Sequence, residues 1–195
     1  MKKFELTSEF VTFLGKKLFR IKALISFGNV EEGELGGYVE KEENLSNDGD
    51  AWVFGDARVF GDARVSGNAR VFGDAWVSGN ARVFGDAEVF GDARVFGDAW
   101  VSGNARVSGN AEVFGDARVS GNADYATVQG FGSEYRATTF FRTKAGDIGV
   151  RCGCFYGTLE EFRAKVKETH RETKTAKEYL MVADLMEFRF SKEEV

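Results

Sequence analysis

The chain has 195 residues, of which 43% are hydrophobic and 29% charged, a composition that fits neither a membrane-embedded nor a disordered protein. The formal net charge of −5 argues against a general nucleic-acid-binding protein. Glycine occurs 24 times and proline does not occur. Histidine occurs once, and this single copy excludes most catalytic mechanisms that use histidine.

Residues 1–48 precede a long repeat and are predicted to form an N-terminal cap on it. Short apolar strands are expected around Phe4–Leu6, Phe10–Leu14 and Leu18–Leu24. The end of a solenoid exposes unpaired backbone groups and an open core, so it has to be covered. The N-terminal sequence has no apolar segment of signal-peptide length, and no stretch approaches a membrane span. We therefore expect a cytoplasmic protein.

Residues 49–126 are thirteen consecutive hexapeptides of the form Gly-(Asp/Asn)-Ala-x-Val-(Phe/Ser), and only the last, GNADYA, departs from it. Ala and Val are two residues apart, so in an extended segment they face one side and the x residue faces the other. The Gly-Asp or Gly-Asn pair tolerates the positive φ that a corner needs. A short strand and a corner every six residues predict a triangular parallel β-helix of about four coils.

Residues 127–195 are predicted to form a small α+β module that packs on the last coil. Glu134–Lys144 and Ile148–Cys152 are expected to pair as a hairpin. Two helices follow, and each begins with a predicted capping box, at Thr158–Glu161 and at Thr175–Glu178.

Three residues of this module could in principle bind a metal. Cys152 and Cys154 are two residues apart, a spacing with poor disulfide geometry on a strand, so reduced thiols are the simplest interpretation. With His170 they supply too few ligands for a metal site. We expect no metal or other cofactor, and we expect His170 to interact with the C-terminus of the first helix.

The repeat resembles the left-handed parallel β-helix of the hexapeptide-repeat superfamily, whose motif has an aliphatic residue and a small residue two positions before it. Val53, Val59 and Val65 match the aliphatic position, and Ala57 and Ala63 match the small one. Phe or Ser directly after the valine departs from the motif. The resemblance implies the left-handed sense of the coil.

The lead-in LGGYVEKEENLS and the tail GCFYGTLEEFRAKVKETH extend the resemblance to essentially the whole chain. They resemble a group of hexapeptide-repeat proteins found in bacteria and in their phages. The resemblance implies a small intracellular protein, often phage- or prophage-borne and then active in the host cytoplasm. It implies no particular activity.

Many left-handed β-helices are acyltransferases, which makes this the first enzymatic activity to weigh. Enzymes of that kind use a histidine base beside an extruded loop, whereas this repeat has neither. The γ-class carbonic anhydrases need three histidines around zinc. We therefore expect a non-enzymatic protein without catalytic residues.

Residues 18 apart stack directly in a coil of three hexapeptides, which sorts the outward residues into columns. The x residues of the three faces are Trp52, Arg70, Glu88, Arg106, Asp124; Arg58, Trp76, Arg94, Glu112; and Arg64, Arg82, Trp100, Arg118. Two corner columns are rich in phenylalanine and predict apolar ridges, which usually mark an interface. The candidate partner-binding or ligand-binding residues are Trp52, Phe54, Arg70, Phe72, Trp76, Phe90, Arg94, Phe96, Trp100 and Phe114.

The leading hypothesis is a non-enzymatic, oligomeric interaction protein that acts on a host macromolecule, for example as an inhibitor of a host defence. A trimer would bury the ridges most simply, and a dimer is the alternative. The second hypothesis is a sponge-like binder of a nucleotide or other small anionic ligand at subunit interfaces, through Arg and aromatic side chains. The third is a purely structural or assembly element. Direct binding to nucleic acid or to a membrane is not expected.

A simpler origin of the surface pattern competes with selection for binding. Trp52, Trp76 and Trp100 are 24 residues apart rather than 18. This spacing indicates duplication of a four-hexapeptide unit, out of step with a three-hexapeptide coil. The tryptophans would then move from face to face as a by-product of copying.

Overall fold

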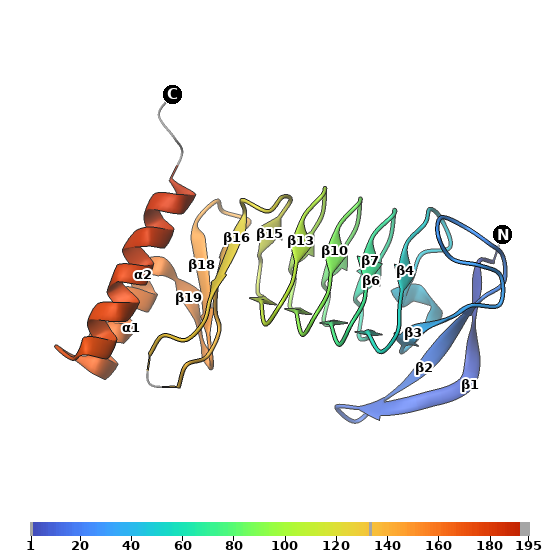
Figure 1. Cartoon of the computed structure of the whole chain (residues 1–195), viewed down its shortest axis with the longest axis horizontal. Coiled ribbons are helices and arrows are strands. Elements are labelled where there is room, and N and C mark those ends of the chain that lie inside the picture. The colour runs from blue at the N-terminus through green and yellow to red at the C-terminus, as the bar shows by residue number, and fades with distance from the viewer. Residues whose placement is uncertain (1, 133, 192–195) are drawn as a thin grey trace.

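A computed structural model describes residues 2–132 and 134–191. The chain is elongated, with a parallel β-solenoid between an N-terminal hairpin and a C-terminal module of sheet and helices (Figure 1). The predicted mainly β fold, with a parallel β-helix and a small α+β module after it, is therefore confirmed. Residues 1, 133 and 192–195 of the predicted cap and module lie outside the described residues.

The cap begins with a β-hairpin. β1 (Phe4–Phe13) and β2 (Lys16–Ala23) pair antiparallel around a tight turn at Leu14 and Gly15, whose φ angles are 49° and 77°. The two strands predicted before this turn form one strand, because a register shift between Leu6 and Phe10 absorbs the break in the apolar pattern. β3 (Leu35–Val39) follows and pairs antiparallel with β2.

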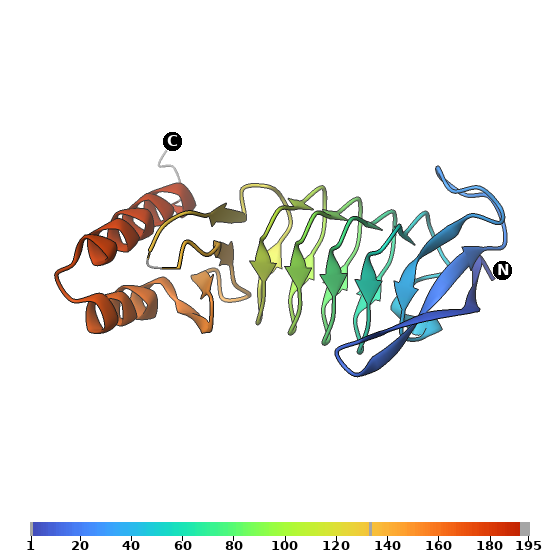
Figure 2. The same cartoon turned by 60° about the horizontal axis from the view of Figure 1, so that its bottom comes forward.

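Twelve strands of two residues each form the three faces of the solenoid (Figure 2). Strands three apart in the chain stack in parallel, in the register that the 18-residue rule predicts. The strands are β4 (Trp52–Val53), β5 (Arg58–Val59), β6 (Arg64–Val65), β7 (Arg70–Val71), β8 (Trp76–Val77), β9 (Arg82–Val83), β10 (Glu88–Val89), β11 (Arg94–Val95), β12 (Trp100–Val101), β13 (Arg106–Val107), β14 (Glu112–Val113) and β15 (Arg118–Val119).

The solenoid has about five turns rather than the four predicted. β3 stacks in parallel on β5, and Leu45 forms a parallel bridge with Val65. One face therefore contains five parallel strands, in the order β3-β5-β8-β11-β14. The extra turn was not visible in the sequence because its residues do not follow the hexapeptide form.

Alanine and valine fill the interior, as predicted. Every Val from Val53 to Val119 and every Ala from Ala51 to Ala117 in the motif is at most 1% exposed. Each buried valine side chain stabilises the fold by roughly 1.5 kcal/mol. The corners require glycine for two reasons: Gly67 has φ +69°, and a Cβ there would lie 2.9 Å from the backbone N of Gly85 in the next turn.

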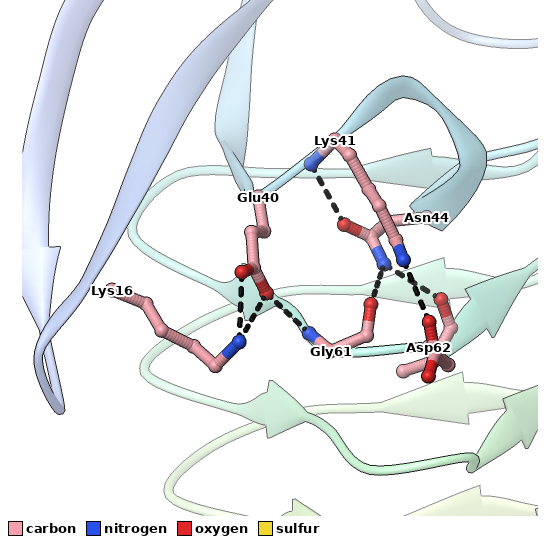
Figure 3. A network of polar contacts seen from close by, with 7 residues as sticks. Lys16, Glu40, Lys41, Asn44, Gly61 and Asp62 are labelled. Atoms are coloured by element: carbon pink, nitrogen blue, oxygen red, sulfur yellow. Dashed lines mark hydrogen bonds and ion pairs between the residues drawn. The ribbon is translucent and has the colours of Figure 1, made fainter.

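The corner at Gly61, between β5 and β6, is tied to the cap through Glu40 (Figure 3). Its carboxylate accepts hydrogen bonds from Lys16 Nζ at 2.7 and 2.9 Å and from the Gly61 N–H at 2.6 Å. Burial raises the pKa of Glu40, but these hydrogen bonds outweigh it and hold the pKa below its usual value. One carboxylate thus joins the hairpin, the end of β3 and the corner between β5 and β6.

A buried asparagine completes this junction (Figure 3). Asn44, in the 3-10 helix η1 (Glu42–Asn44), is 0% exposed and donates to the carbonyls of Gly61 at 3.0 Å and Ala63 at 2.8 Å. Its Oδ1 accepts from the Lys41 N–H, and Lys41 Nζ pairs with Asp62 at 2.7 Å. The EKEEN segment of the lead-in therefore closes the N-terminal end of the solenoid.

The C-terminal module is a four-stranded antiparallel sheet covered by two helices (Figure 1). The predicted hairpin is present, and the sequence interpretation missed a strand on each side of it. The elements are β16 (Tyr125–Val128), β17 (Thr138–Arg142), β18 (Ile148–Cys152), β19 (Phe155–Thr158), α1 (Leu159–His170) and α2 (Lys174–Phe190). None of the described helices is long and apolar enough to cross a membrane.

One of the two predicted helix caps is correct. Thr158 and Glu161 form a reciprocal capping box at the start of α1, as predicted. The predicted start of α2 at Thr175 is wrong. Thr173 is the N-cap, and its side chain accepts a hydrogen bond from the Ala176 N–H.

Candidate functional site

The solenoid displays nine of the ten candidate residues on its faces and corners, and buries the tenth. Trp52 is 0% exposed because the cap covers it: the rings of Phe4 and Phe27 pack edge-on against it, with centroids 6.3 and 5.4 Å away. The expectation that Trp52 contacts a partner does not fit this position. Trp52 is a core residue that seats the cap.

The second face carries a continuous column of aromatic rings. Trp76 stacks on Phe60 at 5.7 Å and on Phe96 at 6.0 Å, and Phe96 packs against Phe114 at 4.5 Å. Arg94 lies over Trp76, with its Cζ 5.3 Å from the ring centroid. These side chains stabilise one another along the axis of the solenoid.

Both ends of this aromatic column are covered by the flanking modules. The Phe13 ring at the tip of the hairpin packs edge-on against Phe60 and Trp76, with centroids 5.7 Å away in both cases. Tyr156 packs edge-on against Phe114 at 4.8 Å. The column therefore connects the cap to the C-terminal module and is only half available to a partner.

The other phenylalanine corner is also self-stacked. The Phe72 and Phe90 rings are parallel within 2° and 4.8 Å apart, and Phe54 packs against the solenoid core. All three side chains are half-buried. The predicted apolar ridges exist, but ring stacking has already covered part of their surface.

On each of two faces one arginine pairs with a glutamate of the next strand, whereas Arg58 and Arg70 of these faces have no carboxylate within 4.0 Å among the described residues. Arg106 pairs with Glu88 on the first face at 2.9 Å, and Arg94 pairs with Glu112 on the second at 3.1 Å. Arg70 is in register with Glu88. The alternation of charge predicted for the first face thus forms a real ion pair between stacked strands.

The third face carries three arginines and no glutamate at its outward positions. The arginine face consists of Arg64, Arg82, Trp100 and Arg118, on β6, β9, β12 and β15. Within residues 2–132 and 134–191, none of its arginines has a carboxylate partner within 4.0 Å. Arg64 and Arg82 are paired directly in register, an arrangement of like charges that destabilises a sheet. The arginine face therefore keeps unneutralised charge at a cost in stability.

Trp100 is held between two of these arginines. The Cζ atoms of Arg82 and Arg118 lie 5.2 and 4.4 Å from its ring centroid, on neighbouring strands to either side. Arg118 also donates to the carbonyls of Asp98 and Asp116. These contacts orient the guanidinium group of Arg118, and Trp100 orients that of Arg82.

A groove of about 850 Å³ runs from the arginine face to the cap. Arg82, Phe84 and Trp100 line its solenoid side, and Glu43 and Asp48 line its cap side. The rings of Phe84 and Trp100 thus give the groove an apolar surface, with Arg82 on its basic side and Glu43 and Asp48 on its acidic side.

Sequence reasoning sorted this column correctly but left Arg64, Arg82 and Arg118 out of the candidate set. The signal was available, because the third column is the one without an acidic residue at its x positions. The candidate residues were instead mostly tryptophans and phenylalanines, which are concentrated on the other two faces and at their corners.

A second hollow, of about 480 Å³, lies in the C-terminal module between the β18–β19 turn and α1. Phe162 and Val166 contribute to its apolar wall, and Arg136, Lys165 and His170 are among its basic residues. It is large enough for a small molecule with an apolar body and an anionic group.

The reactive side chains in this hollow include the thiols of Cys152 and Cys154 and the phenols of Tyr156 and Tyr179. Cys152 and Cys154 are both free, as predicted, and the Thr138 hydroxyl donates to Cys152 Sγ at 3.1 Å. Burial, followed by the neighbouring Cys152, raises the pKa of Tyr179 to about 12. The phenol stays protonated at neutral pH and can donate a hydrogen bond to a ligand. His170 ends α1, as predicted, and its ring lies 5.7 Å from that of Tyr179.

The comparisons with known proteins agree with the repeat. Residues 63–79 match the family model described as the YdcK beta-solenoid repeat. A search of curated proteins found no match. The parallel stacking and this match together identify the chain as a β-solenoid repeat protein.

Proposed function

We propose that this chain is a non-enzymatic interaction protein whose arginine face binds an acidic surface of a partner protein. The observation that carries the proposal is that the strands of the arginine face carry no glutamate at their x positions, whereas each of the other two faces has one, which pairs with Arg106 or Arg94. An oriented guanidinium without a carboxylate is prepared to bind one from outside. The stacked like charges would be relieved by such a partner.

The flanking residues favour a protein with a few acidic side chains over a nucleic acid. Asp98 and Asp116 lie along one edge of the arginine face, and Asp86 lies along the other. A continuous phosphate backbone would be repelled at these edges. The neighbouring strands place Arg82 and Arg118 over opposite faces of Trp100, so a base could stack there only by displacing one of them.

The finer family assignment and the biological setting follow from the resemblance of the sequence. We assign the solenoid to the left-handed hexapeptide-repeat superfamily, which its hexapeptide motif and positive-φ corner glycines support. The lead-in and tail support a bacterial or phage origin. The proposed partner is accordingly a host macromolecule in the cytoplasm, such as a component of a defence system.

Affinity capture from a lysate of the source bacterium tests this function. The test compares wild-type protein with two double variants, R82Q/R118Q and R94Q/R106Q, which lose the same charge from different faces. We expect wild-type protein and R94Q/R106Q to retain the same partner, and R82Q/R118Q to lose it. Recovery of the chain alone by all three proteins would contradict the proposal.

The hollow in the C-terminal module favours a second candidate function, the binding of a small anionic ligand. Its apolar wall suits the body of a nucleotide or an aromatic carboxylate, whose anionic group would replace Glu134 and Glu168 as the partners of Arg136 and Lys165. Calorimetry with a nucleotide panel, using wild-type protein and Phe162→Ala, tests this candidate. Heat release that Phe162→Ala abolishes would support it, and no signal across the panel would reject nucleotide binding.

A further inference from the structure

Among the described residues, the most exposed apolar side chains that lie together are on α2, away from the solenoid. Met181, Leu185 and Phe188 are 71%, 57% and 78% exposed. They are four and three residues apart, the spacing of one helix stripe, while Tyr179 and Ala183 face the sheet and are buried. Met181, Leu185 and Phe188 together form the α2 stripe. A stripe of large apolar side chains on an exposed helix usually packs against another surface.

The position of α2 leaves this stripe uncovered by residues 2–132 and 134–191. α2 forms the extreme C-terminal end of the elongated molecule, beyond the sheet of the module (Figure 1). The corner phenylalanines, by contrast, are half-buried by stacking. The strongest drive for self-association therefore lies at this end of the molecule rather than along the corners of the solenoid.

The charges beside the stripe are complementary to those of a second, antiparallel α2. Glu178 and Arg189 are eleven residues apart, about three helical turns, so they lie along the same edge. In a pair of antiparallel helices related by a two-fold axis beside Leu185, the same edge of both helices lies on one side of the pair, and the two chains run in opposite directions along it. A residue before Leu185 in one copy therefore lies beside a residue after Leu185 in the other. Glu178 of one copy then lies within about 4.5 Å, along the axis, of Arg189 of the second copy, a distance that the two long side chains can span.

These two side chains are also free to form the contact. Glu178 has only a long pair with Lys174 at 3.7 Å, and Arg189 donates only to the Asn122 carbonyl at 3.4 Å within the described residues. The other edge of the helix is already occupied, because Arg163 of α1 pairs with Asp184 and Glu187. Charge pairing thus selects one edge and one direction for the second helix.

We propose that a second copy of this chain docks on the α2 stripe, as a two-fold, tail-to-tail dimer with antiparallel α2 helices. Two Glu178–Arg189 ion pairs flank six apolar side chains at its centre. The interface is small, so the dimer is weak and forms in the micromolar range. The two solenoids point away from each other and present two arginine faces, which would strengthen binding to a partner with repeated sites. This proposal does not depend on the function of the arginine face.

Sedimentation velocity on the full-length protein at about 10 to 200 µM tests the dimer. We expect a concentration-dependent mass approaching twice the 21.5 kDa of one chain. Leu185→Glu is expected to remain a monomer at every concentration. Leu14→Glu is the matched control, since it places the same charge at a 68% exposed leucine on the cap hairpin, and it should dimerise like wild type.

A charge exchange separates the proposed geometry from a general loss of folding. Glu178→Arg and Arg189→Glu should each weaken dimerisation about tenfold, and the two changes together should restore it. A wild-type mass of one chain throughout, a trimer mass, or a dimer that survives Leu185→Glu would overturn the proposal. Failure of the double exchange to restore the dimer would overturn the antiparallel arrangement of the helices.

Discussion

The Phe13 ring at the tip of the cap hairpin packs edge-on against Trp76 on the second face of the solenoid, with centroids 5.7 Å apart and planes at 77°. A residue that the sequence suggested as a binding residue is thus part of the attachment of the cap. Trp76 also stacks on Phe60 and Phe96, so one ring connects the hairpin to two turns of the repeat. This contact gives the aromatic column of the second face a structural role.

Replacing Trp76 should therefore loosen the hairpin. We expect Trp76→Ala to lower the free energy of unfolding by about 2 kcal/mol and to accelerate hydrogen exchange in β1 and β2, because Phe13 loses its packing partner. Trp100→Ala is the control, since the ring of Trp100 packs against Arg82, Arg118 and Phe84 of the solenoid, whereas that of Trp76 packs against Phe13 of the hairpin. Equal acceleration of exchange in the hairpin by both variants would show that Trp76 does not hold it.

The junction residue Asn44 should be far more important than an exposed asparagine of the repeat. Asn44→Ala leaves two buried carbonyls and the Lys41 N–H without their partner, and should cost about 3 kcal/mol in urea unfolding. Asn80→Ala removes only an exposed contact with Asp98 and should change stability by less than about 0.5 kcal/mol. Similar losses in the two variants would contradict the role assigned to Asn44.

Lys3 should make the protein more stable as the pH rises above neutrality. Burial lowers its pKa to about 8, although Asp50 and Asp48 oppose this effect, and Lys3 Nζ donates to the carbonyls of Gly49 and Ala51. The ordinary lysine pKa of the unfolded chain is higher, so the unfolded chain binds more protons between these values. The free energy of unfolding should then increase by about 2 kcal/mol from pH 7.5 to 9.5.

Urea unfolding of wild type and Lys3→Met at the two pH values measures this effect. The methionine variant should lack the Lys3 contribution, so its gain between the two pH values should be about 2 kcal/mol smaller. The high pKa of Tyr179 acts in the opposite direction only above about pH 10, outside this window. An equal pH dependence in the two proteins would exclude Lys3 as the source.

The like charges of the arginine face should have a thermodynamic signature without any partner. Arg64→Gln relieves repulsion with Arg82 and should be neutral or slightly stabilising at low salt. Arg94→Gln removes the Glu112 ion pair and the contact with Trp76, and should cost about 1 kcal/mol. Thermal melts at low and high salt distinguish the two. A loss in Arg64→Gln as large as that in Arg94→Gln would mean that Arg64 is stabilised by its surroundings.

The repeat could be predicted from the sequence because each hexapeptide contains both the residues of one strand and the glycine of the corner before it. The interior positions, the corner glycines and the 18-residue register all follow from one short motif. The cap and module were harder, since their elements depend on partners far away in the chain. β16 looks like the end of the last hexapeptide, and β19 has four residues, so neither could be recognised without the sheet that they join.

The candidate site was only partly predictable for a similar reason. The 18-residue spacing predicts that Arg82 lies beside Trp100. Phe4 and Phe27 cover Trp52 from outside the repeat, so the spacing does not predict that contact. Thr175 and Thr173 both precede a helical pattern, and only tertiary packing decided between them. Which surfaces remain open after the ends have folded is a property of the whole chain rather than of its motif.

The most direct test of the central proposal is the dissociation constant of the captured partner, measured by calorimetry at physiological salt for wild type and the two double variants. R82Q/R118Q should weaken binding at least about tenfold, because two oriented guanidinium groups lose their acidic partners. R94Q/R106Q should remain within about twofold of wild type, since those arginines are neutralised within the chain. Equal affinities for the two variants, or a larger loss in R94Q/R106Q, would contradict binding through the arginine face.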